Sequence, residues 1–193
     1  LPSATGPLLG EAAARGYKPA WFGQTPTWID GFFNPQVVPH AVFANYFLVS
    51  GMPYWGEDTE GMPKFVAAYD KYGKDQSPQD SYLLLSYSLG LLPVEIVRRG
   101  IEAGDLTREG LLAMIPKITA FDGGGLFKPV DLSKFPYVTS TQTRVMRPDF
   151  DKKSWIVLGD WASPSAIGTV PAESSKTAAA TPAATGVGSV GLR

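Results

Sequence analysis

Apolar and aromatic side chains recur at intervals of three and four positions over residues 59–72, the spacing that places side chains on one face of an α-helix. The stripe comprises Met62, Phe65, Val66, Tyr69 and Tyr72. Gly73 follows it directly. The sequence therefore predicts an amphipathic helix that ends at Gly73.

Residues 3–15 have a weaker helical pattern. Ser3 or Thr5 is suited to cap the start, and Gly16 stands where a residue in the left-handed conformation often ends a helix. The predicted inner face is Leu8, Leu9, Ala12 and Ala13.

Two further helices are predicted later in the chain. The first covers about residues 79–102, where Gly90 and Pro93 indicate a kink or a break. Thr107 is suited to cap the second, which runs to about Ile118. Its predicted buried side is Leu111, Leu112, Met114 and Ile115.

Short runs rich in β-branched and aromatic side chains favour strands. Between them we expect a polar turn (24–27), a short helix (28–34) and a loop (50–58). The predicted strands cover residues 19–23, 40–49, 136–146 and 154–160, the last two as a hairpin around a polar connection.

The alternation of strands and helices predicts the α/β class. The first element is a helix without the preceding strand that a βαβ unit would need, so we expect the chain to begin inside a domain. Residues 162–193 consist mainly of Ala, Thr, Ser, Gly and Pro, which predicts a disordered tail.

Composition excludes several classes of function. With 17 basic and 18 acidic side chains the formal net charge is −1, which gives no footprint for nucleic-acid binding. The lack of cysteine excludes thiolate chemistry, and the single histidine, His40, excludes a His-rich metal site. The longest apolar stretch, residues 82–97, is too short and too interrupted to span a bilayer.

Three consecutive glycines at 123–125, followed by Lys128, invite comparison with a phosphate-binding loop. Such a loop needs a strand before it and a helix N-terminus after it. Here the glycines follow a helix and lead towards strands, and Pro129 follows the lysine. We interpret the run as a tight turn that uses positive φ angles.

Catalytic signals are weak. His40 stands at the start of an apolar run, where a lone histidine is usually structural. The pairs Glu57–Asp58 and Asp58–Glu60 stand near a helix start, where acidic residues favour the helix dipole without any chemistry. An acid/base pair of the glycosidase type is the alternative interpretation.

Residues 24–28, QTPTW, have the composition of a binding site. They directly follow a predicted strand, and α/β proteins bind ligands beyond the carboxyl ends of their strands. Gln24, Thr25 and Thr27 offer amide and hydroxyl groups, and Trp28 offers an apolar wall. Most of the neighbouring aromatic residues are expected in the core: Trp21, Phe22, Phe32, Phe33, Tyr54 and Trp55.

The order and spacing of several segments carry a resemblance. They are GPLLGEAAARGYKPAWFG, FLVSGMPYW, KFVAAYDKYGKDQSPQDSYLLLSY, DLTREGLLAMIPKITAFDGGG and PYVTSTQTRVMRPDFDKKSWIVLGDW. Together they resemble the C-terminal part of a type I periplasmic substrate-binding protein of ABC transporters, from the branched-chain amino acid (leucine/isoleucine/valine) group. The resemblance covers about residues 6–161.

In that family two α/β lobes, joined by crossing strands, close on a small ligand. The resemblance implies that residues 1–50 belong to the C-terminal lobe and that SGMPYW crosses the hinge. It places residues 51–130 as helices of the N-terminal lobe and residues 131–161 back in the C-terminal lobe.

The resemblance also implies a ligand site. In amino-acid binders the turn after the first strand offers an acidic side chain to the ligand's ammonium, and here Gln24 and Thr25 hold that place. This departure counts against an α-amino acid ligand. Tyr82 falls at the family's aromatic contact position, and Trp28 and Tyr54 extend the expected apolar wall.

The resemblance thus implies a solute-binding component of an ABC importer, periplasmic or lipid-anchored outside the cell. It would have no catalytic residue and no cofactor, and its partners would be a membrane permease and a branched-chain amino acid, an amide or a small carboxylate. Two alternatives stay open. One is the ligand-sensing domain of a receptor or regulator with the same fold, and the other is a hydrolase-like or glycosidase enzyme with a nucleophile or carboxylate pair near QTPTW.

Overall fold

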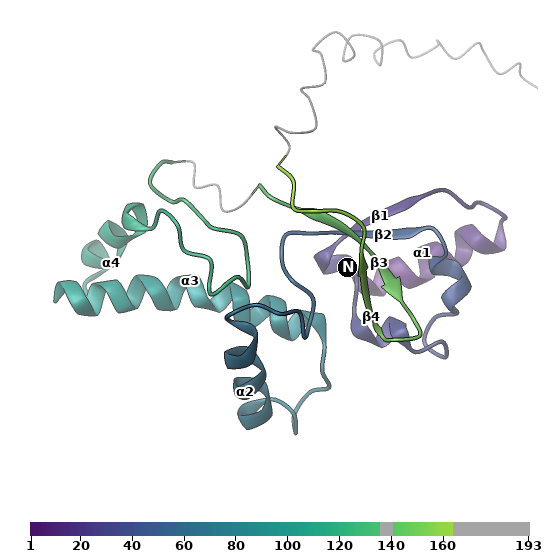
Figure 1. Ribbon diagram of the computed structural model, residues 1–193, viewed down its shortest axis with the longest axis horizontal. Coiled ribbons are helices and arrows are strands. Elements are labelled where there is room, and N and C mark those ends of the chain that lie inside the picture. The colour runs from purple at the N-terminus through teal and green to yellow at the C-terminus, as the bar shows by residue number, and fades with distance from the viewer. Residues whose placement is uncertain (136–140, 164–193) are drawn as a thin grey trace, which may run out of the picture. The chain divides into compact units, whose positions relative to one another are not determined.

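A computed structural model describes residues 1–135 and 141–163, all within one compact unit, Leu1–Ser163 (Figure 1). The fold is α/β, as predicted. Its α-helices are α1 (Pro2–Ala14), α2 (Met62–Tyr72), α3 (Ser81–Ala103) and α4 (Arg108–Met114). Its strands are β1 (Trp21–Gln24), β2 (Tyr46–Ser50), β3 (Arg144–Asp149) and β4 (Ser154–Val157). Short 3-10 helices are η1 (Thr25–Thr27), η2 (Asp30–Phe33), η3 (His40–Phe43) and η4 (Ile115–Lys117).

The strands form one mixed sheet in the order β1-β2-β3-β4. β1 and β2 are parallel, with Gln24 opposite Val49, and β3 runs antiparallel to β2, with Arg144 opposite Ser50. The predicted hairpin is confirmed as β3 and β4. Because of these directions, the ends of β1 and β2 and the start of β3 meet at one edge of the sheet.

Aromatic side chains form the core beside the sheet. Trp28 lies at the centre of this core and is 1% exposed. Its ring contacts those of Phe32, Phe33, Phe43, Tyr46, Phe150 and Trp155. Leu9 of α1 belongs to the same cluster. Edge-on and tilted aromatic pairs each contribute about 0.5–1.5 kcal/mol beyond the burial of their area, so this cluster holds α1, η2, η3 and the sheet together.

Two smaller apolar clusters hold the helices. One joins Met52, Met62, Phe65, Leu84 and Leu126, and the other joins Ile118, Val130 and Leu132. Within the described ranges, every helix is too short or too polar to serve as a membrane span.

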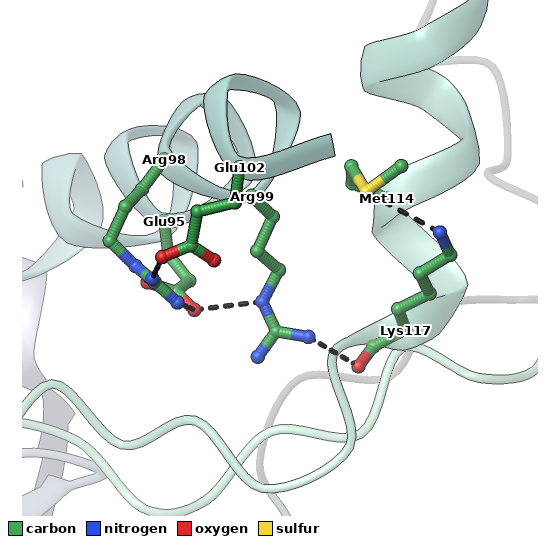
Figure 2. A network of polar contacts seen from close by, with 6 residues as sticks. All are labelled: Glu95, Arg98, Arg99, Glu102, Met114 and Lys117. Carbon is green, nitrogen blue, oxygen red and sulfur yellow. Dashed lines mark hydrogen bonds and ion pairs between the residues drawn. The ribbon is translucent and has the colours of Figure 1, made fainter. Parts of the chain in front are cut away.

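An ionic network fixes α3 to the segment after α4 (Figure 2). Glu95, which is buried, accepts hydrogen bonds from Arg98 and from Arg99, and Arg98 also pairs with Glu102. Hydrogen bonding from Arg98, with help from Arg99, lowers the pKa of the Glu95 carboxyl to about 2. Arg99 in turn donates to the carbonyl of Lys117 at 2.6 Å.

The helix predictions are largely confirmed. Thr107 caps α4 by accepting a hydrogen bond from Gly110 N at 3.1 Å. A break at Gly90 and Pro93 is wrong, because α3 is one continuous helix through both residues. Gly16 has a positive φ of 72° at the end of α1. The predicted caps Ser3 and Thr5 are wrong, because α1 begins at Pro2 and no side chain caps it.

Some predicted inner-face residues are wrong as well. Leu8, Leu112 and Tyr72 are all more than half exposed, whereas Leu9, Met114 and Phe65 are buried. In α1, α2 and α4 the buried stripe is therefore narrower than the run of apolar residues.

The predicted strand at residues 40–49 is half wrong. Residues His40–Phe43 form η3, and only Tyr46–Ser50 is strand. The His40 ring stacks on Phe150, with centroids 3.9 Å apart, and its Nε2 lies 3.1 Å from the Phe33 carbonyl oxygen. These contacts select the turn conformation over the extended one, and they support the structural interpretation of His40. The predicted helix at 28–34 is likewise shorter, covering only η2.

The glycine run is the predicted turn. Gly123, Gly124 and Gly125 have φ angles of 63°, 73° and 80°. The Gly124 carbonyl accepts a hydrogen bond from Gly61 N at 2.7 Å, just before α2. The turn therefore anchors the start of α2.

At the end of the described chain, Ala162 pairs with Thr143 in an isolated β-bridge. Residues 162 and 163 of the predicted tail are thus part of the described structure, and the rest of that tail, 164–193, lies outside the described residues. Residues 136–140 of the predicted hairpin also lie outside them, and β3 begins only at Arg144.

Candidate ligand-binding site

The hydroxyl of Thr25 joins the ends of the two parallel strands. Its Oγ1 lies 3.2 Å from the Oγ of Ser50, the last residue of β2. Ser50 donates its own hydroxyl hydrogen to the Met52 carbonyl at 2.8 Å. Since Ser50 has one hydrogen to give, Thr25 is the donor in the pair, and the Thr25 oxygen keeps only acceptor capacity.

The start of α3 is hydrogen-bonded to the segment after β1. The Tyr82 hydroxyl donates to the Pro26 carbonyl at 2.6 Å. Asp80, the N-cap residue of α3, accepts from Tyr82 N at 2.7 Å and from Asp30 N at 3.0 Å. Residues 25–30 and 80–82, distant in sequence, thus form one hydrogen-bonded group.

Asp30 is a half-buried carboxylate of this group. It accepts hydrogen bonds from Ser81 Oγ at 2.7 Å and from the Trp28 indole at 3.2 Å. Burial, with a smaller contribution from the nearby Asp80 charge, raises the pKa of the Asp30 carboxyl despite these hydrogen bonds. Its partners are thus those of a structural carboxylate that bridges two elements.

A cavity of about 380 Å³ opens between these strand ends and α3. Its polar lining consists of Gln24, Thr25, Ser88, Gln142 and Thr143. The remainder is Pro26, Val49, Gly51, Met52, Leu85, Leu89, Leu92, Leu126, Phe127 and Val130. The volume is that of a small-molecule site, and the mixture of an apolar wall with a few polar groups is typical of one.

The structure brings part of the predicted site together. Gln24 and Thr25 line the cavity, and Tyr82 bonds to its lining residue Pro26. Trp28 and Tyr54 instead line a neighbouring space of about 10 Å³ behind Thr25, which is too small for an organic ligand. Their predicted part in ligand binding stays a prediction.

Sequence reasoning missed the wall that α3 supplies. Leu85, Ser88, Leu89 and Leu92 are spaced by three, four and seven positions from the first, so they share one face of the helix. That spacing was visible in the sequence, but it is also the pattern of an ordinary core helix. Leu126, Phe127 and Val130, just after the glycine turn, face the same cavity.

The acidic residues before α2 have a different role from the one predicted. Helix α2 begins only at Met62, and its first turn holds no acidic residue. Glu57 instead forms an ion pair with Arg144 and accepts a hydrogen bond from Tyr54 N at 3.1 Å. The Arg144 guanidinium also lies 4.4 Å from the centroid of the Trp161 ring, and Lys128 Nζ lies 4.2 Å from that centroid.

No protein-family model and no curated protein matches the chain. Solved structures do match. A fatty acid ABC transporter substrate-binding protein from Thermomonospora curvata superposes with a TM-score of 0.71 at 21% identity, covering 84% of this chain and 41% of that one. A branched chain amino acid ABC transporter from Thermus thermophilus with bound valine superposes with a TM-score of 0.65 at 18% identity. The match covers 82% of this chain and 43% of that one. A substrate-binding periplasmic protein from Ralstonia solanacearum superposes with a TM-score of 0.65 at 19% identity. The match covers 79% of this chain and 42% of that one.

These similarities establish the fold as that of type I periplasmic binding protein lobes. The chain spans about two fifths of the length of the structures that it matches. These structural neighbours are described as substrate-binding or transporter proteins.

Proposed function

We propose that this chain is the C-terminal part of the solute-binding component of an ABC importer. The component would capture a small organic ligand by lobe closure and present the closed form to a membrane permease outside the cytoplasm. The similarity of fold to three such proteins supports the proposal, as does the order of motifs along the sequence.

In this proposal the chain contributes to both lobes. Residues 1–50 and 131–161 belong to the C-terminal lobe, whose sheet is β1-β2-β3-β4, and residues 51–130 supply helices to the N-terminal lobe. The chain would cross between lobes near residues 50–55 and 126–130. Both segments contribute to the lining of the 380 Å³ cavity, and so do Gln142 and Thr143, just before β3.

One observation carries the functional proposal. The cavity lies at the carboxyl ends of two parallel strands, where α/β proteins bind ligands, and α3 forms its opposite wall. The hydrogen bond from Tyr82 to the Pro26 carbonyl joins the two walls beside the cavity. This is the arrangement that a hinged binding protein needs, with groups from both sides meeting around the solute.

The ligand classes suggested by the sequence were a branched-chain amino acid, an amide or a small carboxylate. Among the similar structures one is described as a fatty acid transporter protein and another contains valine. The three classes differ in charge, so a titration panel separates them.

The test is a tryptophan-fluorescence titration of the complete protein with leucine, valine, simple amides and aliphatic carboxylates. We expect saturable binding of one class without turnover. Thr25→Ala and Tyr82→Ala should each weaken it, whereas Tyr72→Ala, on an exposed face of α2, should not. Turnover of any bound compound, or binding that ignores both site variants, would refute the proposal.

A further inference from the structure

We infer that the 380 Å³ cavity binds an uncharged ligand with an aliphatic chain and a hydrogen-bond-donating head, such as a primary amide or an alcohol. This inference deepens the proposed function and rests on it. It comes from the charge, the shape and the hydrogen-bonding capacity of the lining.

The lining carries no ionisable side chain. All 15 of its residues are apolar, hydroxylic, amidic or glycine. Elsewhere among the described residues, the buried Arg144 is already paired with Glu57. A zwitterionic amino acid or a carboxylate would therefore enter without a counter-charge from the described residues of the lining, and burying an unpaired charge is strongly unfavourable.

The apolar part of the cavity is elongated. Leu85, Leu89 and Leu92 lie along one face of α3, and a rise of 1.5 Å per residue gives this row a length of roughly 10 Å. Leu126 and Phe127 line the same space. Leu89 is 67% exposed, so a bound aliphatic chain would cover a leucine that the described residues leave in contact with water.

Two of the three hydroxyl groups in the lining, those of Thr25 and Ser88, already donate their hydrogens within the protein. Ser88 donates its hydrogen to the Leu84 carbonyl at 2.7 Å, and Thr25 donates to Ser50. Both oxygens therefore offer lone pairs rather than hydrogens to a ligand. A carboxylate has only acceptors and is mismatched to them, whereas an amide N–H or an alcohol O–H is matched. Gln24 also lines the cavity, and its side-chain amide can donate to a ligand carbonyl.

The experiment titrates the complete protein with octanamide, octan-1-ol, octanoate and leucine at pH 8, by calorimetry. We expect octanamide and octan-1-ol to bind at least tenfold more tightly than octanoate, and leucine to bind more weakly still. Leu89→Lys places an ammonium at the cavity and should shift the preference between octanamide and octanoate at least tenfold towards octanoate. Val94→Lys, on an exposed position of the same helix outside the lining, should leave that preference unchanged.

The outcomes separate this inference from the proposed function. Tighter binding of leucine or octanoate than of octanamide by the unaltered protein would overturn the inference and leave the solute-binding function standing. Equal shifts from Leu89→Lys and Val94→Lys would also overturn it, because the ligand would then lie outside this cavity. Failure of all four compounds together with every compound of the wider panel would instead refute solute binding itself.

Discussion

Arg144 and Glu57 lie 87 positions apart in the sequence and form a two-point ion pair, with Nη1 and Oε1 separated by 2.8 Å and a second bond between Nη2 and Oε2. The Arg144 side chain is 6% exposed and that of Glu57 is 20% exposed. Arg144 begins β3, and Glu57 belongs to the loop between β2 and α2. The pair therefore fixes the path of the chain as it leaves the sheet.

Removing one partner of this pair should destabilise the protein strongly. Glu57→Gln leaves the buried Arg144 guanidinium without its counter-charge, and we expect a loss of about 3 kcal/mol in the free energy of unfolding. Urea denaturation of the complete protein measures it. Asp58→Asn, at the exposed neighbouring position, should change stability by less than about 0.5 kcal/mol. Similar losses of unfolding free energy in the two variants would show that the ion pair does not stabilise the fold.

Local signals predicted much of this fold. The 3.6-residue period of α2, the Thr107 cap and the positive φ angles of Gly123–Gly125 each depend on a few neighbouring residues, and each is present in the structure. The strand predicted at 40–49 failed for the opposite reason. Its β-branched and aromatic composition suits a strand, but contacts of His40 with Phe33 and Phe150 decide the conformation.

The candidate site could be predicted from the sequence only in part. Gln24 and Thr25 follow a strand directly, so their place at the cavity could be inferred from topology. The α3 wall could not, because Leu85 and Leu89 carry the same periodic signal as a core helix. The pairing of Glu57 with Arg144 depends on how the sheet closes, which no short stretch of sequence encodes.

The pKa of Glu95, lowered to about 2, makes this residue a source of acid sensitivity. Because the folded-state pKa lies below the unfolded one, its contribution is fully present above pH 4.5 and is lost as the pH falls towards 2. Glu95→Gln should cost about 1–2 kcal/mol at pH 7, less than a fully buried pair, because Arg98 is half exposed and solvent screens its charge.

Denaturation of the complete protein at several pH values between 3 and 7 checks the Glu95 prediction. The difference in stability between the unaltered protein and Glu95→Gln should stay constant from pH 7 to about 4.5 and shrink as the pH falls from there to 3. Glu11→Gln, in an exposed pair with Arg15, serves as control and should show almost no difference at any pH. A difference for Glu95→Gln that stays constant down to pH 3 would contradict the assignment.

Asp30 should show the opposite dependence on pH. Burial raises its pKa above the usual 3.8, so its contribution is present below pH 3.8 and is lost as the pH rises through the folded-state pKa. Asp30→Asn keeps an oxygen for Ser81 and the Trp28 indole while removing the charge. The variant should therefore gain stability relative to the unaltered protein as the pH rises above 3.8. Parallel stability curves for the two proteins over that range would refute the prediction.

Replacing Gly61 and replacing Gly90 with alanine should change the stability of the protein in opposite directions. A Cβ at Gly61 would lie 2.5 Å from the Gly123 carbonyl oxygen and 2.8 Å from Leu126 Cγ, so Gly61→Ala should force the glycine turn away from α2 and cost about 1–3 kcal/mol. At Gly90, in the middle of α3, no described atom lies within 4 Å of an added Cβ. Gly90→Ala should stabilise the helix by about 0.5–1 kcal/mol. Thermal denaturation of both variants tests the pair, and a destabilising Gly90→Ala would show that this helix face is covered in the complete protein.

The hydroxyl of Tyr82 should contribute to ligand affinity without touching the ligand. Tyr82 does not line the cavity, but its bond to the Pro26 carbonyl joins the α3 wall to the strand wall. Tyr82→Phe keeps the ring and removes this one bond, worth about 1 kcal/mol. If the bond forms only when the two walls meet, the closed form becomes less populated and affinity falls about fivefold for every ligand tested. Calorimetry with two ligands of different head group measures this, with Tyr72→Phe as control. A loss confined to one ligand would mean that the hydroxyl contacts that ligand directly, and a gain in affinity would mean that ligand entry has to break the bond.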